Sequence, residues 1–277
     1  MKEKIENSKK ELEILKKTAR DPEELIICFN NRGCDGIVFG YQHGAANFFA
    51  MMANSLIPTL KRIGVKTLYL EKDQNYQSQV DRYLETGEYQ EELKSYLSFF
   101  EAYWDGGEQT VLILEAARKY GLEVRFIDQP GLPFSFFERD QLVLRGKDRD
   151  EHMFLNIKDH QKFFPEKYAV VTGYSHAAIS MYEQEGEIRN PLAHRLGTLH
   201  KRVFSSITVG KGTSYVIEIY KALFSLSFDG SKGWDFREIE NRGTFLDNQL
   251  LYSKKLLSLY SGLIFCSSDM QNRNNSR

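Results

Sequence analysis

Residues Gly33–Glu71 read GCDGIVFGYQHGAANFFAMMANSLIPTLKRIGVKTLYLE and carry the clearest pattern in the chain. The run up to Gly40 is β-branched and aromatic, which is typical of a buried strand that stops at a glycine. Residues 45–63 place apolar side chains at spacings of three and four, which predicts a helix with one buried face, ended by Gly64. Residues 65–70 read as a second buried strand. The whole is a βαβ unit, whose two strands we expect to be parallel.

Two histidines follow strands of this kind in matching contexts. His43 stands at the end of a Gly-x-x-His pattern that begins at Gly40, and His176 ends a second copy that begins at Gly173, after the strand-like run 168–173. In open α/β sheets ligands bind at the carboxyl ends of the strands, so we expect both histidines at one functional edge. Either histidine alone would fit an ordinary strand end, but the repeated pattern favours a shared site.

Charged residues are predicted at the same edge. Glu71 follows the second strand, and Asp128 ends a third predicted strand that begins at residue 122. Arg149 and Asp150 open a predicted helix that continues to residue 158. An Arg–Asp pair at a helix start is commonly capping and surface pairing. Its place between the third strand and the second Gly-x-x-His strand also allows it to reach the site.

Composition narrows the class of protein. The chain has 277 residues, of which 42% are hydrophobic, and a formal net charge of −1. This length allows one large domain or two small ones, and the near-neutral charge gives no basis for a nucleic-acid partner. The three cysteines lack the spacing of metal or redox motifs, and their odd number argues against a disulfide framework. We expect buried free thiols.

The N-terminus is rich in lysine and glutamate and lacks the apolar segment of a Sec signal peptide. No apolar run is long enough to span a bilayer. These features predict a soluble protein that is cytoplasmic, or exported as an effector without a Sec signal. A charged helix over residues 5–18, with a narrow apolar stripe, is a candidate contact for a protein partner.

We divide the chain into an N-terminal helical segment, residues 1–32, a single α/β catalytic-type domain, residues 33–266, and a polar tail, residues 267–277. Within the domain, the Gly-, Ser- and Asp-rich segment 225–242 predicts a long loop. The segment 250–263 predicts a weak helix.

The paired Gly-x-x-His motifs, a strand followed by Glu71 and an Arg-Asp-x-x-Met helix that starts at Arg149 resemble one superfamily. It contains the erythromycin esterases, the ChaN-like haem-binding lipoproteins, the TraB/PrgY and TIKI proteases and a domain of the Pasteurella multocida toxin. The resemblance covers residues 33–178 and implies an α/β fold of the erythromycin esterase/ChaN-like type, with a central, mostly parallel or mixed sheet flanked by helices. Tyr41 and Gln42 depart from the esterases, which usually carry Gly-Glu before the first motif histidine.

Together with this resemblance, the residue types imply a hydrolase that activates water to cleave an ester or peptide bond in a small molecule or peptide. His43 would be the general base and Glu71 would orient it, while Arg149 would stabilise negative charge on the substrate. His176 would be a second acid or base, and Asp128 completes the catalytic set. An alternative is metal-assisted hydrolysis, in which His43, Glu71 and His176 bind a divalent ion.

Two further alternatives remain open. A carrier of haem or another ligand, of the ChaN type, would use His43 or His176 without turnover. A bacterial toxin or effector domain of the same fold would act on a host target. Substitution of Glu71 separates an enzyme from a carrier, because an enzyme should lose turnover while it still binds its ligand.

Overall fold

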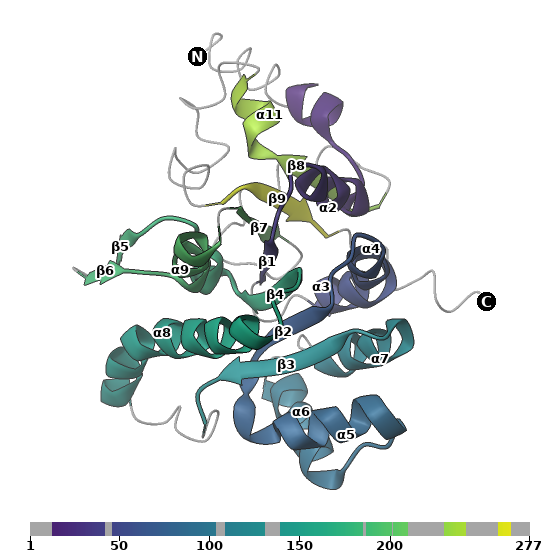
Figure 1. Cartoon of the computed structure of the whole chain (residues 1–277). Helices are drawn as coiled ribbons and strands as arrows, with labels where there is room; N and C mark the ends of the chain where they lie inside the picture. The colour runs from purple at the N-terminus through teal and green to yellow at the C-terminus, as the bar shows by residue number, and fades with distance from the viewer. Residues whose placement is uncertain are drawn as a thin grey trace.

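The computed structural model of the chain describes residues 13–41, 46–103, 109–130, 139–184, 187–200, 202–209, 230–241 and 260–266. In this part of the chain a seven-stranded sheet carries helices on both faces (Figure 1). The strand order is β3-β2-β4-β1-β7-β9-β8. Neighbouring strands are parallel except at one edge, where β8 runs antiparallel to β9. The predicted α/β fold with a mostly parallel sheet is confirmed.

The two strands of the predicted βαβ unit, β1 and β2, are not neighbours in the sheet, because another strand lies between them. The strands of the main sheet are β1 (Gly36–Tyr41), β2 (Thr67–Asp73), β3 (Glu123–Asp128), β4 (Tyr168–Gly173), β7 (Val203–Val209), β8 (Lys232–Asp235) and β9 (Gly262–Phe265). Strand β4 lies between β1 and β2 and is parallel to both, so the two Gly-x-x-His strands are neighbours. A separate antiparallel hairpin is formed by β5 (Tyr182–Gln184) and β6 (Glu187–Arg189).

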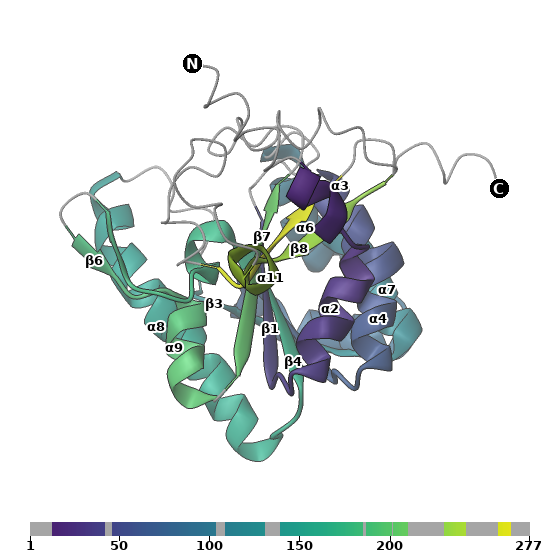
Figure 2. The same ribbon diagram turned by 90° about the horizontal axis from the view of Figure 1, so that it is seen from above.

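Each face of the sheet has its own helical layer and apolar core (Figure 2). The first layer consists of α2 (Pro22–Asn31), α3 (Ala46–Met51), α4 (Ile57–Arg62), α5 (Gln77–Thr86), α6 (Glu91–Tyr103) and α7 (Thr110–Tyr120). The second layer includes α8 (Arg139–Phe163), α9 (Leu192–Leu199) and α11 (Phe236–Asn241). Strand residues alternate between the cores: Ile37 and Phe39 face the first layer and Val38 faces the second.

The helix predicted over residues 45–63 forms as one run whose middle turn, Met52–Leu56, widens into a π-helix. Pro58 gives this widening a physical cause, because it has no N–H for the carbonyl of Asn54 and its ring would clash there. Gly64 follows the helix with a φ of 92°, in the left-handed region that favours glycine, so the predicted stop is confirmed.

Other boundaries differ from prediction. The segment 225–242 is not one long loop, because β8 and α11 occupy residues 232–241. The helix predicted over 250–263 is wrong at its end, where β9 begins at Gly262, and its residues 250–259 lie outside the described chain. Helix α8 begins at Arg139, so Arg149 does not open it. None of the helices in the described part of the chain has the length and apolar character that a membrane span needs.

Of the predicted N-terminal helix, residues 13–18 are described and are helical. Leu15 is buried in the core of the second layer, and its carbonyl accepts a hydrogen bond of 2.9 Å from the indole of Trp234 in β8. The end of this helix therefore packs on the sheet edge. A protein partner for the helix stays a prediction.

Gly40 does not end β1, which continues to Tyr41. Its role is close packing instead. A Cβ atom at Gly40 would lie 2.6 Å from the Cβ of Ala177 and 3.1 Å from the Cα of Tyr174. These two residues bound the turn η3 (Tyr174–Ala177), which follows β4 and carries the second motif histidine. The glycine of the first motif thus makes room for the turn of the second.

We predict that Gly40→Ala lowers the free energy of unfolding by about 1–3 kcal/mol, because the backbone of η3 must move. Urea unfolding followed by circular dichroism measures this change. Gly197→Ala in α9 is the matched control, since no atom lies within 4 Å of the added Cβ. Alanine favours a helix over glycine, so the control should be neutral or up to about 1 kcal/mol more stable. Equal stability of the two variants would contradict the packing role of Gly40.

Candidate active site

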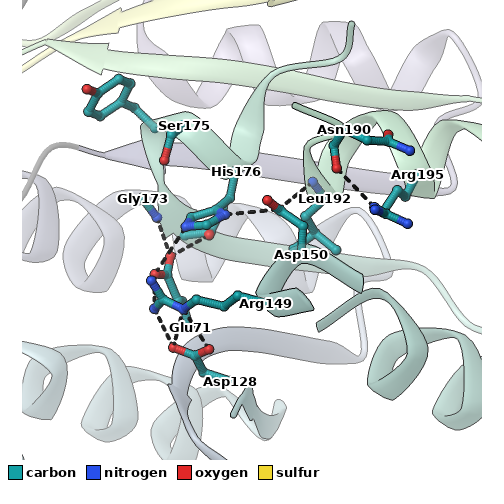
Figure 3. A network of polar contacts seen from close by, with 12 residues as sticks. Glu71, Asp128, Arg149, Asp150, Gly173, Ser175, His176, Asn190, Leu192 and Arg195 are labelled. Carbon is teal, nitrogen blue, oxygen red and sulfur yellow. Dashed lines mark hydrogen bonds and ion pairs between the residues drawn. The ribbon is translucent and has the colours of Figure 1, made fainter. Parts of the chain in front are cut away.

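The carboxyl ends of β2, β3 and β4 bring charged side chains of the described chain together (Figure 3). Glu71 lies near the end of β2, Asp128 ends β3, and His176 follows β4. Arg149 and Asp150 come from α8, which packs on the same face of the sheet. This is the edge at which the sequence predicted a site.

The guanidinium group of Arg149 bridges β2 and β3. Its Nε atom donates to both carboxylate oxygens of Asp128, at 2.8 and 3.0 Å, and its Nη2 atom donates to Oε1 of Glu71 at 2.5 Å. Nη2 also pairs with Asp128. Burial opposes the charge of Arg149, but the negative charges of Glu71 and Asp128 outweigh it and raise the pKa of Arg149. The guanidinium is therefore a permanent cation that holds two buried carboxylates.

The second oxygen of Glu71 is fixed from the neighbouring strand β4. The hydroxyl of Thr172 and the backbone N–H of Gly173 each donate to Oε2 of Glu71, at 2.5 Å. Hydrogen bonds to a charged acceptor are stronger than neutral ones. Glu71 is 6% exposed and has little freedom to rotate, because donors hold both of its oxygens.

His176 is held between two carboxylates. Its Nδ1 atom lies 2.9 Å from Oδ1 of Asp150, and its Nε2 atom lies 3.6 Å from Oε1 of Glu71. The same Asp150 oxygen accepts the backbone N–H of Leu192, at 2.7 Å, where α9 begins. Asp150 thus fixes the orientation of the imidazole ring and leaves Nε2 directed into the cluster.

These surroundings determine the charge of His176. Burial favours the neutral ring, but the negative charges of Asp150 and Glu71 outweigh burial and the opposing charge of Arg149. The pKa of His176 is raised to about 9. The ring is therefore an imidazolium at neutral pH, with a proton on Nε2 that it can donate.

Of the residues predicted from sequence, Glu71, Asp128, Arg149 and His176 lie in one cluster. His43 lies outside the described residues. It follows Tyr41 by two positions, and Tyr41 is in register with Gly173 on the adjacent strand β4. The catalytic roles of these residues stay predictions.

The sequence placed the pair Arg149 and Asp150 within reach of the site but gave a catalytic role to Arg149 alone. The two are consecutive in α8, yet they contact different parts of the cluster: Arg149 reaches β2 and β3, whereas Asp150 reaches His176 and α9. The adjacent Arg-Asp pair was the signal available in the sequence. The partner of Asp150 could not be identified there, because it lies 26 positions away on another element.

Glu71 and His176, as they stand, do not fit a divalent metal ion. Both oxygens of Glu71 already accept hydrogen bonds, and the cationic Arg149 donates to one of them. A divalent cation at that oxygen would meet strong repulsion at short range. His176 would also have to give up the proton on Nε2. The contacts of these two residues favour the metal-free alternative, while His43, the third predicted ligand, lies outside the described chain.

A second polar cluster lies between α2, β8 and α11. Cys28, Asp235 and Glu238 place atoms that could bind a metal within 4.8 Å of one another, beside a cavity of about 450 Å³. Arg32 pairs with Asp235 and Arg20 pairs with Glu238. Because two guanidinium groups already neutralise these carboxylates, we interpret the cluster as a structural link between α2, β8 and α11.

The chain matches solved structures, although no family model and no curated protein match it. A protein from Bacillus cereus matches with a TM-score of 0.62 at 12% identity, over 94% of this chain and 97% of that one. A mutant of erythromycin esterase EreC in its open conformation matches with a TM-score of 0.61 at 11% identity, over 87% and 92%. The C-terminal region of Pasteurella multocida toxin, described as having a thiol-protease-like catalytic triad, matches with a TM-score of 0.51 at 14% identity, over 69% and 25%.

At these identities the likeness shows the fold alone. The chain is an α/β protein with the erythromycin esterase-like fold, and the resemblance predicted from the sequence is confirmed at that level. The chain spans only 34–38% of the length of three bacterial toxin structures that it also matches.

The raised pKa of His176 predicts that stability depends on pH. Its pKa is 6.5 in an unfolded chain and about 9 in the fold, so its contribution is fully present below 6.5 and is lost as pH rises through about 9. The free energy of unfolding should fall by at most about 3 kcal/mol over that range. Urea unfolding between about pH 6 and pH 10 measures this fall. In the Asp150→Asn variant the free energy of unfolding should depend less on pH. An equal pH dependence in the variant and the wild-type protein would contradict the ion pair.

Proposed function

We propose that this chain is a hydrolase that cleaves an ester or peptide bond by adding water to a carbonyl carbon. The observation that carries the proposal is the Asp150–His176 pair, whose Nε2 atom faces Glu71 at the carboxyl edge of the sheet. An aspartate that orients a histidine, with the other ring nitrogen directed into the site, is the arrangement that acid–base catalysis needs.

His176 is proposed as the general acid. An imidazolium with a pKa near 9 holds its proton at neutral pH and can pass it to the oxygen or nitrogen of the leaving group. A peptide bond needs this step more than an ester does, because an amine leaves poorly without a proton. After the transfer, Asp150 keeps the neutral ring in place until solvent returns the proton.

His43 is proposed as the base that takes a proton from the attacking water. Histidine suits this role, because it is the side chain whose unperturbed pKa lies nearest to neutral pH. Glu71 is fixed by Arg149, Thr172 and Gly173, and its carboxylate would orient the water or the base. The roles of the two histidines are therefore complementary: one accepts a proton while the other donates one.

A second candidate is the use of the same chemistry by a toxin or effector domain. The fold shared with the Pasteurella multocida toxin region supports this candidate. A carrier of haem is less well supported, because Nε2 of His176 faces the carboxylate of Glu71 and the ring is charged, whereas a ligand of haem iron must be a neutral imidazole.

We predict that His176→Asn lowers kcat by about 10²–10⁴-fold, the loss expected when a general acid is removed. Turnover of a fluorogenic peptide library measures the effect, while p-nitrophenyl acetate, whose leaving group departs without a proton, should be affected much less. His200→Gln is the control, because His200 lies at the end of α9 with its ring 5.2 Å from that of Tyr168, outside the cluster. If the wild-type protein turns over neither class of probe, the hydrolase proposal is wrong.

The pH profile provides a second test of the same role. Because His176 must be protonated to donate, kcat/KM should fall as pH rises through about 9. Asp150→Asn removes the largest attraction for the imidazolium, so its alkaline limb should move to lower pH. If kcat/KM falls at the same alkaline pH in the variant and the wild-type protein, the fall is caused by a group other than His176.

A further inference from the structure

The hairpin of β5 and β6 is joined to the candidate active site at both of its ends. The turn η3, which carries His176, precedes it, and the hydroxyl of Tyr182 in β5 donates to the carbonyl of Ser175, at 3.4 Å. After the hairpin the chain enters α9, where the backbone N–H of Leu192 donates to Asp150. The hairpin belongs to no other sheet and projects from the molecule beside α9 (Figure 1). It therefore extends outwards from the site.

One face of the hairpin carries exposed apolar side chains. Tyr182 packs on the core of the second layer, so the face that it shares with its partner Arg189 is turned to the protein. Side chains alternate along a strand, so Met181 and Ile188 lie on the opposite face. Met181 is 55% exposed and Ile188 is 74% exposed. Two apolar side chains on the outer face of a projecting hairpin favour a contact with a ligand of the neighbouring site.

The edge of β6 also offers backbone groups for pairing. Only residues 185 and 186 separate the two strands, and in such hairpins the pair that closes the loop, Gln184 and Glu187, is hydrogen-bonded. Bonded and non-bonded pairs alternate along an antiparallel ladder, so the next pair, Glu183 and Ile188, is non-bonded. The N–H and C=O of Ile188 therefore point away from β5. No backbone hydrogen bond to another part of the described chain occupies them.

These features define what can bind along β6. A two-stranded hairpin of three residue pairs is marginally stable by itself, and a third strand would add backbone hydrogen bonds to it. Such an edge is complemented by N–H and C=O groups that recur at strand spacing, which an extended polypeptide has and a small ester lacks. The apolar face beside this edge would contact alternate side chains of the bound strand.

We propose that β6 binds an extended segment of a polypeptide substrate as a third strand of the hairpin and leads it to the cluster of Glu71 and His176. This inference rests on the hydrolase proposed above and assigns a polypeptide, rather than a small ester, as its substrate. The N–H and C=O of Ile188 pair with the main chain of the segment. The protein's own chain passes from Ile188 to Leu192, which contacts Asp150, in a few residues, so a strand bound alongside reaches the cluster within a similar length.

The first test replaces Ile188 by proline, which has no N–H. The lost N–H points away from β5, so the hydrogen bonds of the hairpin are kept, and proline is tolerated at such edge positions. With the fluorogenic peptides, Ile188→Pro should raise KM by about 10-fold, the effect of one or two lost hydrogen bonds, with little change in kcat. Ile188→Val keeps the N–H and should keep KM within about twofold of the wild-type value. An equally small change in Ile188→Pro would overturn the proposal.

Leu155→Ala is the control for the loss of apolar surface, because Leu155 is an exposed apolar residue of α8. The peptide KM of this variant should equal that of the wild-type protein. A rise as large as that of Ile188→Pro would show that general loss of apolar surface causes the effect, and would overturn strand addition.

A second test uses the wild-type protein, so it holds even if Ile188→Pro fails to fold. A peptide that is turned over is prepared with a single backbone N-methyl group at each position in turn. In an added strand only alternate N–H groups face the edge of β6, so KM should rise at every second position. A rise at no position, or an equal rise at consecutive positions, would overturn strand addition.

The remaining outcomes separate this inference from the hydrolase proposal. Turnover of p-nitrophenyl acetate without turnover of any peptide would overturn the inference and leave a hydrolase. If neither probe is turned over, the hydrolase proposal fails, and binding to an array of the same peptides decides about β6. Binding that Ile188→Pro weakens by about 10-fold would support strand addition, whereas no binding, or equal binding by the variant, would overturn it.

A second copy of this chain is the competing occupant of the edge. Sedimentation velocity of the wild-type protein and of Ile188→Pro tests for it. We expect the same oligomeric state in both proteins. A wild-type dimer that Ile188→Pro separates into monomers would show that β6 pairs with its own copy, and would overturn the proposal.

Discussion

The bridge from Arg149 to Glu71 and Asp128 is the interaction on which the rest of the site depends. It joins α8 to the ends of two parallel strands, and it pairs with two carboxylates that are almost fully buried. Without the guanidinium group these buried carboxylates would lose their cationic partner, and breaking a buried ion pair in this way costs about 3–5 kcal/mol. Together with the buried side chains of Met153 and Ile157, the bridge holds α8, and with it Asp150, against the sheet.

From Glu71 the same network continues across the sheet. Its Oε1 atom accepts a hydrogen bond from the guanidinium group, and its Oε2 atom accepts hydrogen bonds from donors at the end of β4. The Nε2 atom of His176 lies 3.6 Å from Oε1. His176 in turn is linked through Asp150 to the start of α9. Since each group is fixed by contacts on at least two sides, the cluster is ordered before a substrate arrives, as electrostatic catalysis requires.

The sequence predicted those parts of the molecule that depend on local pattern. Strands that end in glycine or a carboxylate placed Glu71, Asp128 and His176 at one edge, because parallel strands share their carboxyl ends. It did not identify the partner of Asp150, which depends on where the long helix α8 crosses the sheet. The short strands β8 and β9 were also missed, since their pairing is a long-range property that four-residue runs do not reveal.

The proposed mechanism depends on His176 being an imidazolium that is held by Asp150 and faces Glu71. An NMR titration of the histidine ring signals of the wild-type protein, with His176 assigned through His176→Asn, measures this most directly. We expect a pKa near 9 for His176. A pKa at or below 6.5, the value of a histidine without such partners, would show that the ring is neutral under working conditions and would contradict its role as the acid.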